Sequence, residues 1–331
     1  MHVIVTGVYE GGDVQDLTRA ASFSSSDESV MQWEAGVVKS RGNGQAILVV
    51  TVADQSVEIP VTVSDFERPM PQSFQFETLA VVTKNGCNSG ACHGSPSGKG
   101  GFRLSLLAYD AELDKETLIR EAFGRRTNTL EPKKSLLLQK PLMKVSHGGG
   151  KRLRISDTAY KVLEGWIREG CQVDPEDAPQ CVKLEVLPGD RLLRFPAHSQ
   201  QLVALAHFSD GTTRDVTGLA KFSSSDTQVA SVAVDGLVAG HVRGQAAILV
   251  MFLEKVETVV FTFVEDIEGF KWNDSPENNF IDTFVNNKLN QLQYLPSELC
   301  TDDEFMRRLY LDVLGILPAI DEVQAFLDNP A

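Results

Sequence analysis

The residues with the clearest chemical potential in this chain stand in one short run, Cys87, Cys92 and His93. Two cysteines that can reach one porphyrin, followed at once by a histidine, are typical of covalent haem attachment, for which Cys-x-x-Cys-His is the usual spacing. Here four residues separate the cysteines, and a glycine among them can absorb the extra backbone. Zinc is disfavoured because Cys92 and His93 are neighbours, whereas a Cys87–Cys92 disulfide needs no histidine. The spacing alone leaves haem, disulfide and metal open.

A haem iron ligated by His93 would need a second axial ligand or would keep an open site. Two candidates stand close together in the run "KPLMKVSHGGGKRL", namely Met143 and His147. The glycines that follow the histidine would let the backbone approach a flat ring closely. The alternative is that His147 is an ordinary loop residue and the iron is five-coordinate. Four cations are candidate partners of haem propionates, or else plain surface charges: Arg125, Arg126, Lys151 and Arg152.

The composition excludes several classes of partner. The chain has 331 residues, enough for two or three domains, and a formal net charge of −14. This sign disfavours nucleic acid and anionic membrane surfaces, because both require basic patches on the protein. No run of about 18 apolar residues occurs, and the first 30 residues show no signal-peptide pattern.

An internal repeat sets the organisation of the chain. The run "FSSSDESVMQWEAGVVKSRGNGQAILVV" from Phe23 recurs as "FSSSDTQVASVAVDGLVAGHVRGQAAILV" from Phe222. Short alternating apolar segments between Gly, Ser and Asp turns predict strands of a small antiparallel sandwich. Both copies resemble bacterial immunoglobulin-like modules, which implies an exported or cell-surface protein. The first copy lacks the leading strand of the second, so we expect it to be clipped at its N-terminus.

The segment between the repeats differs in character. Two stretches have helical periodicity, "DAELDKETLIREAFGRR", with Leu118, Ile119, Ala122 and Phe123 on one face, and "SDTAYKVLEGWIREG", with its apolar face centred on Trp166. Three further cysteines remain. A disulfide between Cys171 and Cys181 would close a Pro-containing loop, and Cys300 would be an unpaired, buried residue at the start of a helix.

Several blocks of the inserted segment resemble the planctomycete-type cytochrome c domain. They are "GCNSGACHGSPSGKGGFRLSLLAYDAELD" and "GRRTNTLEPKKSLLLQKPLMKVSHGGGKRL", and the resemblance spans about residues 80–170. In that family the longer Cys-x4-Cys-His form is usual. The resemblance implies one haem c, thioether links from Cys87 and Cys92, and His93 as proximal iron ligand. It also favours His147 over Met143 as sixth ligand, because a histidine before consecutive glycines matches the family.

Residues after Glu265 are expected to be helical. Ser275 or Asp274 would cap a first helix, Thr301 and Gly315 would bound a second, and a third would begin at Pro318. The block "RRLYLDVLGILP" resembles the start of the helical domain of unknown function that accompanies such cytochrome domains.

The predicted fold is therefore multidomain. Residues 1–65 and 182–266 would be Ig-like β-sandwiches, residues 66–181 a mainly α c-type cytochrome domain, and residues 267–331 the truncated start of a helical domain. The predicted function is electron transfer through one covalently bound haem c with bis-His ligation, in the periplasm or at the cell surface.

Two other functions stay open at this point. One is a haem enzyme or gas sensor with an open sixth site; the other is a non-redox adhesive or scaffold module whose Cys87–Cys92 pair is only a disulfide. The expected partner is a redox protein with a basic docking face, or a catalytic domain beyond residue 331. Enzyme activity is left undecided for this chain.

Overall fold

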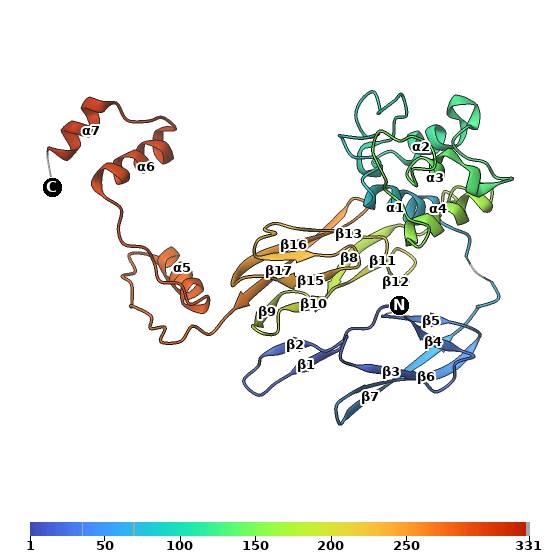
Figure 1. Cartoon of the computed structure of the whole chain (residues 1–331), viewed down its shortest axis with the longest axis horizontal. Coiled ribbons are helices and arrows are strands. Elements are labelled where there is room, and N and C mark those ends of the chain that lie inside the picture. Colours follow the sequence, from blue (N-terminus) through green and yellow to red (C-terminus); the bar gives the residue numbers. More distant parts are fainter. Residues whose placement is uncertain (35, 69, 329–331) are drawn as a thin grey trace. The chain divides into compact units, whose positions relative to one another are not determined.

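The computed structural model describes residues 1–34, 36–68 and 70–328. Within these ranges the chain forms 17 β-strands and seven α-helices. It divides into two compact units, Met1–Glu265 and Asp266–Ala331 (Figure 1). The finer division of the first unit into two sandwiches and an insert stays a prediction from the sequence.

The first repeat forms three small antiparallel sheets. The strand that carries its core is β6 (Gly44–Val52), in which Ala46, Leu48 and Val50 alternate with exposed residues and are buried. This is the period-2 pattern of a strand with one face toward a core. Its other strands are β1 (Thr6–Val8), β2 (Val14–Asp16), β3 (Ser22–Ser25), β4 (Met31–Glu34), β5 (Val37–Ser40) and β7 (Gln55–Val63).

The second repeat is larger and better buried. Its core includes Phe252, Phe261 and Phe263, each at most 1% exposed. Its strands are β8 (Cys181–Leu187), β9 (Arg191–Arg194), β10 (Ser199–Gln201), β11 (Val203–Phe208), β12 (Thr213–Asp215), β13 (Lys221–Ser224), β14 (Ala230–Val232), β15 (Leu237–Gly240), β16 (Gly244–Phe252) and β17 (Lys255–Val264). The parallel pairing of β9 with β17 has no counterpart among the strands described in the first repeat.

The two repeats pair their strands in the same register. In the first, β6 pairs with β7 so that Gly44 lies opposite Val63; in the second, β16 pairs with β17 so that Gly244 lies opposite Phe263. Both glycines have φ of +151°, a value that a side chain would not tolerate well. The matching register shows that the sequence repeat is a structural duplication.

The insert is not the mainly α domain that the sequence predicted. Its helices α1 (Ala80–Lys84), α2 (Ala111–Lys115) and α3 (Leu136–Gln139) have four or five residues each, and α4 (Thr158–Arg168) has 11. Turns and loops make up most of the rest, and residues 94 to 101, with four glycines and one proline, form one such segment. The fold-class prediction is corrected accordingly: within the described ranges the chain is β-rich, with short helices in the insert.

The helix predicted over residues 111–126 is broken. After α2 the chain continues as a short π-helical turn, Glu116–Arg120, and then Ala122 and Phe123 adopt left-handed backbone angles. Leu118 is fully buried as expected, whereas Phe123 points into solvent and is fully exposed. The prediction that these residues share one apolar face was wrong.

Helix α4 is confirmed. Asp157 occupies the N-cap position, and Gly170 follows the helix with φ of +87°. Trp166 and Ile167 are completely buried on the face that the sequence indicated. Helix α4 supplies much of the core of the insert, together with Phe74, Leu79, Leu118 and Leu138.

The insert shares a core with the second repeat. Phe76 and Ala80 pack among the core residues of the second repeat, and Phe76 contacts Phe208 edge to face with ring centroids 5.1 Å apart. In return, Leu219 of the second repeat packs against the core of the insert. The two segments are therefore packed as one body, with α1 at their junction.

Lys84 is a half-buried residue at this junction. Its ammonium donates hydrogen bonds to the carbonyl oxygens of Gly218 and Val234 at 2.8 and 3.0 Å, and a longer one to Thr217. Burial lowers the pKa of Lys84 from 10.5 to about 8, although the charge of Asp235 opposes the shift.

We predict that Lys84 makes unfolding pH-dependent at alkaline pH. Between about pH 8 and 10.5 the unfolded chain binds a proton at this residue that the folded chain has lost, so the free energy of unfolding should rise with pH. The difference between wild type and Lys84→Met should grow by about 3 kcal/mol across this interval, as measured by urea unfolding. A pH-independent difference would contradict the prediction. Taking the difference removes the contributions of other groups that titrate in the same range.

The thiols of Cys171 and Cys181 lie in different hydrophobic cores. Cys171 packs in the core of the insert, Cys181 in that of the second repeat, and all five cysteines are free. The disulfide predicted between them is therefore not formed in the structure. Cys300 is a half-buried free thiol just before α6.

The second unit contains α5 (Phe280–Gln291), α6 (Asp302–Leu314) and α7 (Ile320–Leu327). Thr301 and Gly315 bound α6 as predicted, and Gly315 has left-handed backbone angles. The first helix begins later than predicted, because Asn279 and Asp282 form a capping box that Ser275 cannot offer. Among the described residues, no helix is both long and apolar enough to cross a membrane.

Candidate functional site

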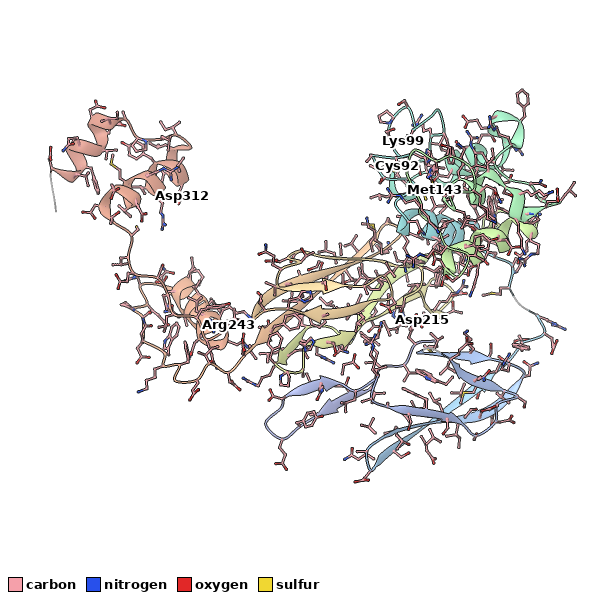
Figure 2. All side chains as sticks on the ribbon, in the orientation of Figure 1. Cys92, Lys99, Met143, Asp215, Arg243 and Asp312 are labelled. Carbon is pink, nitrogen blue, oxygen red and sulfur yellow. The ribbon has the colours of Figure 1, made fainter. Side chains whose placement is uncertain are left out.

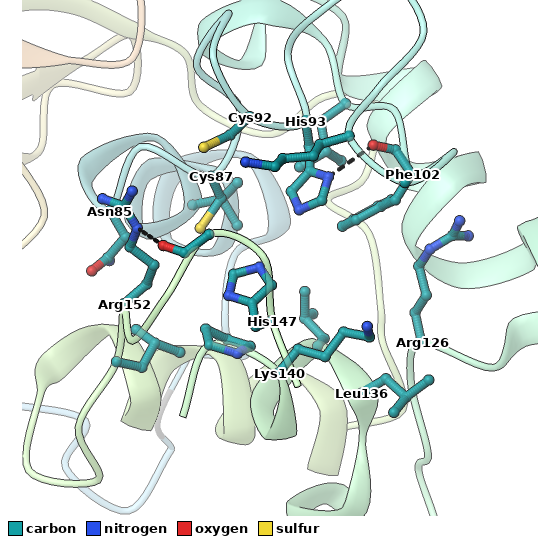
Figure 3. A pocket seen from close by; sticks show the side chains of 18 of the residues that line it. Asn85, Cys87, Cys92, His93, Phe102, Arg126, Leu136, Lys140, His147 and Arg152 are labelled. Atoms are coloured by element: carbon teal, nitrogen blue, oxygen red, sulfur yellow. Dashed lines mark hydrogen bonds between the residues drawn. The ribbon is translucent and has the colours of Figure 1, made fainter. Parts of the chain in front are cut away.

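A pocket of about 470 Å³ in the insert brings the chemistry-bearing residues together (Figure 3). Cys87, Cys92, His93 and His147 all line it, although His147 is far from the others in the sequence. Apolar walls come from α1, α3 and α4, through residues such as Val82, Leu136 and Leu163, and from Phe102 and Leu104 of the loop between α1 and α2. The size and the apolar walls are those of a small-molecule site.

The loop that carries the cysteines is closed by its own backbone. Cys87 N–H donates to the Val82 carbonyl at 3.0 Å, in the turn that ends α1, and His93 N–H donates back to the Cys87 carbonyl at 2.9 Å. Gly94 N–H donates to Ser89 at 3.0 Å. Asn88 is fully buried at the centre of the loop, and its amide donates to Thr83 Oγ1 at 2.9 Å. These hydrogen bonds fix the backbone positions of both cysteines and of His93.

Two histidine rings face each other across the pocket. The centroids of His93 and His147 are 6.2 Å apart, and the ring planes differ by 20°. The Nδ1 atom of His93 lies 2.9 Å from the Phe102 carbonyl, and that of His147 lies 2.8 Å from the Gly150 carbonyl. A carbonyl only accepts, so each Nδ1 carries the proton and, in a neutral ring, each Nε2 is left as an acceptor. Burial lowers the pKa of His93, which favours its neutral form.

A glycine makes the position of His147 possible. A Cβ atom on Gly149 would lie 2.9 Å from Cε1 of His147. The glycine run therefore makes room for the ring of His147 itself, whereas the sequence interpretation assigned it the task of making room for a flat ligand.

Cations stand around the mouth of the pocket. Arg126 lies over the Phe102 ring, 4.4 Å from its centroid, and pairs with Glu121 at 3.0 Å. Arg152 donates from Nε to the Gly149 carbonyl at 2.9 Å. Arg125 also lines the pocket, and Lys151 is an exposed residue beside it. Such a rim favours anionic over cationic molecules at the entrance.

Met143 does not join the site. Its side chain is about half exposed, its φ is +60°, and the pocket is lined without it. Figure 2 shows Met143 on the insert, together with Cys92 and Lys99.

Cys87 is a half-buried thiol that lines the pocket. Burial raises the pKa of Cys87 to about 11, with a smaller contribution from the neighbouring Cys92. Thiolate, not thiol, is the reactive form of cysteine. At neutral pH, the raised pKa therefore keeps Cys87 in its thiol form.

We predict slow alkylation of Cys87 in the reduced protein. At about pH 8, a pKa of about 11 in place of 9.0 lowers the thiolate fraction about a hundredfold. Iodoacetamide should therefore modify Cys87 about a hundred times more slowly in the folded than in the urea-unfolded chain, as followed by peptide mass spectrometry. Equal rates in the two states would contradict the burial of this thiol.

The family described as "PSCyt2: Protein of unknown function (DUF1549)" matches residues 280–331, which lie in the second unit. No curated protein matches the chain.

Solved structures give a distant likeness. "Structure of surface layer protein SbsC, domains 1-6" is 11% identical to this chain, with a TM-score of 0.24. The matched region covers 82% of this chain and 25% of the SbsC chain. "Crystal structure of the S-layer protein SbsC domains 4 and 5" is 11% identical, with a TM-score of 0.23. The matched region covers 80% of this chain and 95% of that structure's chain. This chain thus spans a quarter of the first of these structures. Scores this low carry no argument about fold or function.

The predictions of a cytochrome c domain, a haem cofactor and an iron site are corrected. The matching family model describes a domain of unknown function and lies outside residues 80–170. In the part of the chain that the structure describes, no group of three or more His, Cys, Asp or Glu side chains could hold a metal ion. Electron transfer through a haem is withdrawn with the cofactor.

Proposed function

We propose that this chain is a scaffold module of an exported, cell-surface protein. The observation that carries the proposal is the structural duplication: β3–β6–β7 and β13–β16–β17 repeat one register, Gly44 opposite Val63 and Gly244 opposite Phe263. Many cell-surface domains share the β-sandwich architecture, and repeated modules of this kind commonly serve as spacers or adhesive units. The formal charge of −14 favours a partner with a basic docking face.

Within this proposal, the role of Cys87 and Cys92 is a structural disulfide formed after export. The hydrogen bond from His93 N–H to the Cys87 carbonyl closes the loop in which four residues separate the cysteines. It brings the two ends of this loop together, as a disulfide between the cysteines requires. Oxidation would join the two sulfur atoms and release two protons and two electrons to an exported disulfide oxidant by thiol–disulfide exchange.

Surface location is tested on intact cells that make the full protein with its own export signal. Proteinase added outside should remove an epitope tag placed in the exposed turn at Gly11, where nothing lies within 4 Å of the position that a Cβ atom would take. A tagged cytoplasmic enzyme in the same cells is the control. Protection of the tag until the cells are lysed would contradict the proposal.

The disulfide is tested on protein purified from the exported fraction. Mass spectrometry without reductant should find the peptide that spans both cysteines two hydrogen atoms lighter, and Cys92→Ser should abolish the difference. Free thiols in the exported wild type would overturn the structural disulfide. A visible absorption band that depends on Cys87 and Cys92 would overturn the scaffold role of this segment as well.

A further inference from the structure

A second pocket, of about 350 Å³, lies between the first and second repeats, inside the first compact unit. The first repeat contributes Trp33, Arg19 and His2, and the second contributes Gln201 and Asp235. The residues that line this pocket come from five separate segments of the chain, so no single sequence motif contains them. Its volume is at the lower end of the range for small-molecule sites.

Trp33 provides the aromatic surface of this pocket. Its ring stacks on Phe23 with centroids 3.7 Å apart and planes 14° apart, and Phe23 packs against the core of the first repeat. One face of the indole is therefore held by Phe23, and the half-buried ring lines the pocket. The corresponding residue of the second repeat is Val232, which packs against that repeat's core. The two repeats thus differ at this position: the first has a flat aromatic surface, and the second has an ordinary core residue.

The polar side of the pocket is held in place across the two repeats. Asp16 of the first repeat accepts a hydrogen bond from Gln201 N–H, and the Gln201 amide donates to the Asp235 carbonyl at 2.7 Å. His2 donates from Nδ1 to Asp215 at 2.7 Å. The backbone around Asp235 is consequently positioned before any ligand arrives.

Two charged side chains of opposite sign retain hydrogen-bonding capacity. Arg19 donates one long bond, 3.4 Å, to Gln201 Oε1, and a guanidinium has five N–H donors. Asp235 accepts one bond from Leu237 N–H at 3.2 Å, and a carboxylate has about four lone-pair sites. Both side chains are exposed. A carboxylate and a guanidinium together favour neither an anion nor a cation, but they suit a neutral ligand with many hydroxyl groups.

We propose that this pocket binds one pyranose unit of a saccharide. The C–H face of a pyranose is apolar and flat enough to lie on the indole of Trp33, while its hydroxyls donate to Asp235 and accept from Arg19. The proposal adds a ligand to the scaffold function, but it does not depend on where the protein is located, so either can fail alone.

The test uses the indole N–H signals of the whole chain in ¹H–¹⁵N NMR. The chain has three tryptophans, Trp33, Trp166 and Trp272, so two of the three signals serve as internal controls. The probes are methyl glycosides of glucose, mannose, galactose and N-acetylglucosamine, with acetate and guanidinium as charge controls. At least one glycoside should shift the Trp33 signal in a saturable way and leave Trp166 unmoved.

Two variants make the outcome decisive. Trp33→Val introduces the residue of the other repeat and should weaken binding about tenfold, whereas Trp272→Phe should leave the affinity unchanged. Asp235→Asn keeps an acceptor for Leu237 N–H, so the turn should persist, and it should weaken binding severalfold. The proposal is overturned if none of the glycosides shifts the Trp33 signal. It is also overturned if binding, followed by ligand-detected saturation transfer, is as tight in Trp33→Val as in wild type.

Discussion

Replacing Gly94 by alanine is expected to lower the free energy of unfolding of the first unit by about 3 kcal/mol. A Cβ atom at this position would lie 2.0 Å from the carbonyl oxygen of Asn88 and 2.7 Å from its carbonyl carbon. Both are backbone atoms, and Asn88 is fully buried, so no flexible side chain can give way. The loop that closes on Cys87 would have to open.

Gly90 in the same loop is the matched control. A Cβ atom there would meet nothing within 4 Å, and its φ is not among the positive ones. Gly90→Ala should therefore leave stability unchanged or raise it by less than about 1 kcal/mol. Urea unfolding measures both variants, and the alkylation rate of Cys87 reports the loop locally. Equal stability of the two variants would show that the loop does not close as described.

The repeats could be predicted because the sequence patterns that indicate their strands and turns are local. Strand alternation and turn residues are written into "GQAILVV" and "GQAAILV", so the duplication could be recognised from sequence and the shared register followed from it. The break at Ala122 and Phe123 could not be recognised, since helical periodicity continues through both residues. Tertiary packing, which the periodicity does not contain, decides the backbone there.

The candidate site, too, was predictable only in part. The sequence identified Cys87, Cys92, His93 and His147 as candidates, and the structure places all four on one pocket. The cofactor inferred from the family resemblance did not hold, because a motif supplies residue types and spacing but not a ligand. The pocket at Trp33 was missed altogether. Its one sequence signal was a tryptophan where the second repeat has Val232, which alignment of the copies would have exposed.

A second large effect is expected for Trp166→Ala, which should destabilise the first unit by about 3–5 kcal/mol. The Trp166 side chain is completely buried in the core of the insert and stacks on Phe74 with ring centroids 5.4 Å apart. Its Nε1–H also donates to the Gln172 carbonyl at 2.7 Å. Truncation would leave a cavity and an acceptor without its donor, two effects that add.

Phe123→Ala is the control for this variant, and it also tests the corrected helix. The sequence pattern placed both aromatic residues on core-facing helical surfaces, but Phe123 is fully exposed in the structure. Its truncation should change the free energy of unfolding by less than about 0.5 kcal/mol. Trp166→Phe should fall between the two, because it keeps most of the volume and loses only the hydrogen bond and part of the ring. If Phe123→Ala destabilised the unit as much as Trp166→Ala, the continuous helix predicted from the sequence would be right and the broken one wrong.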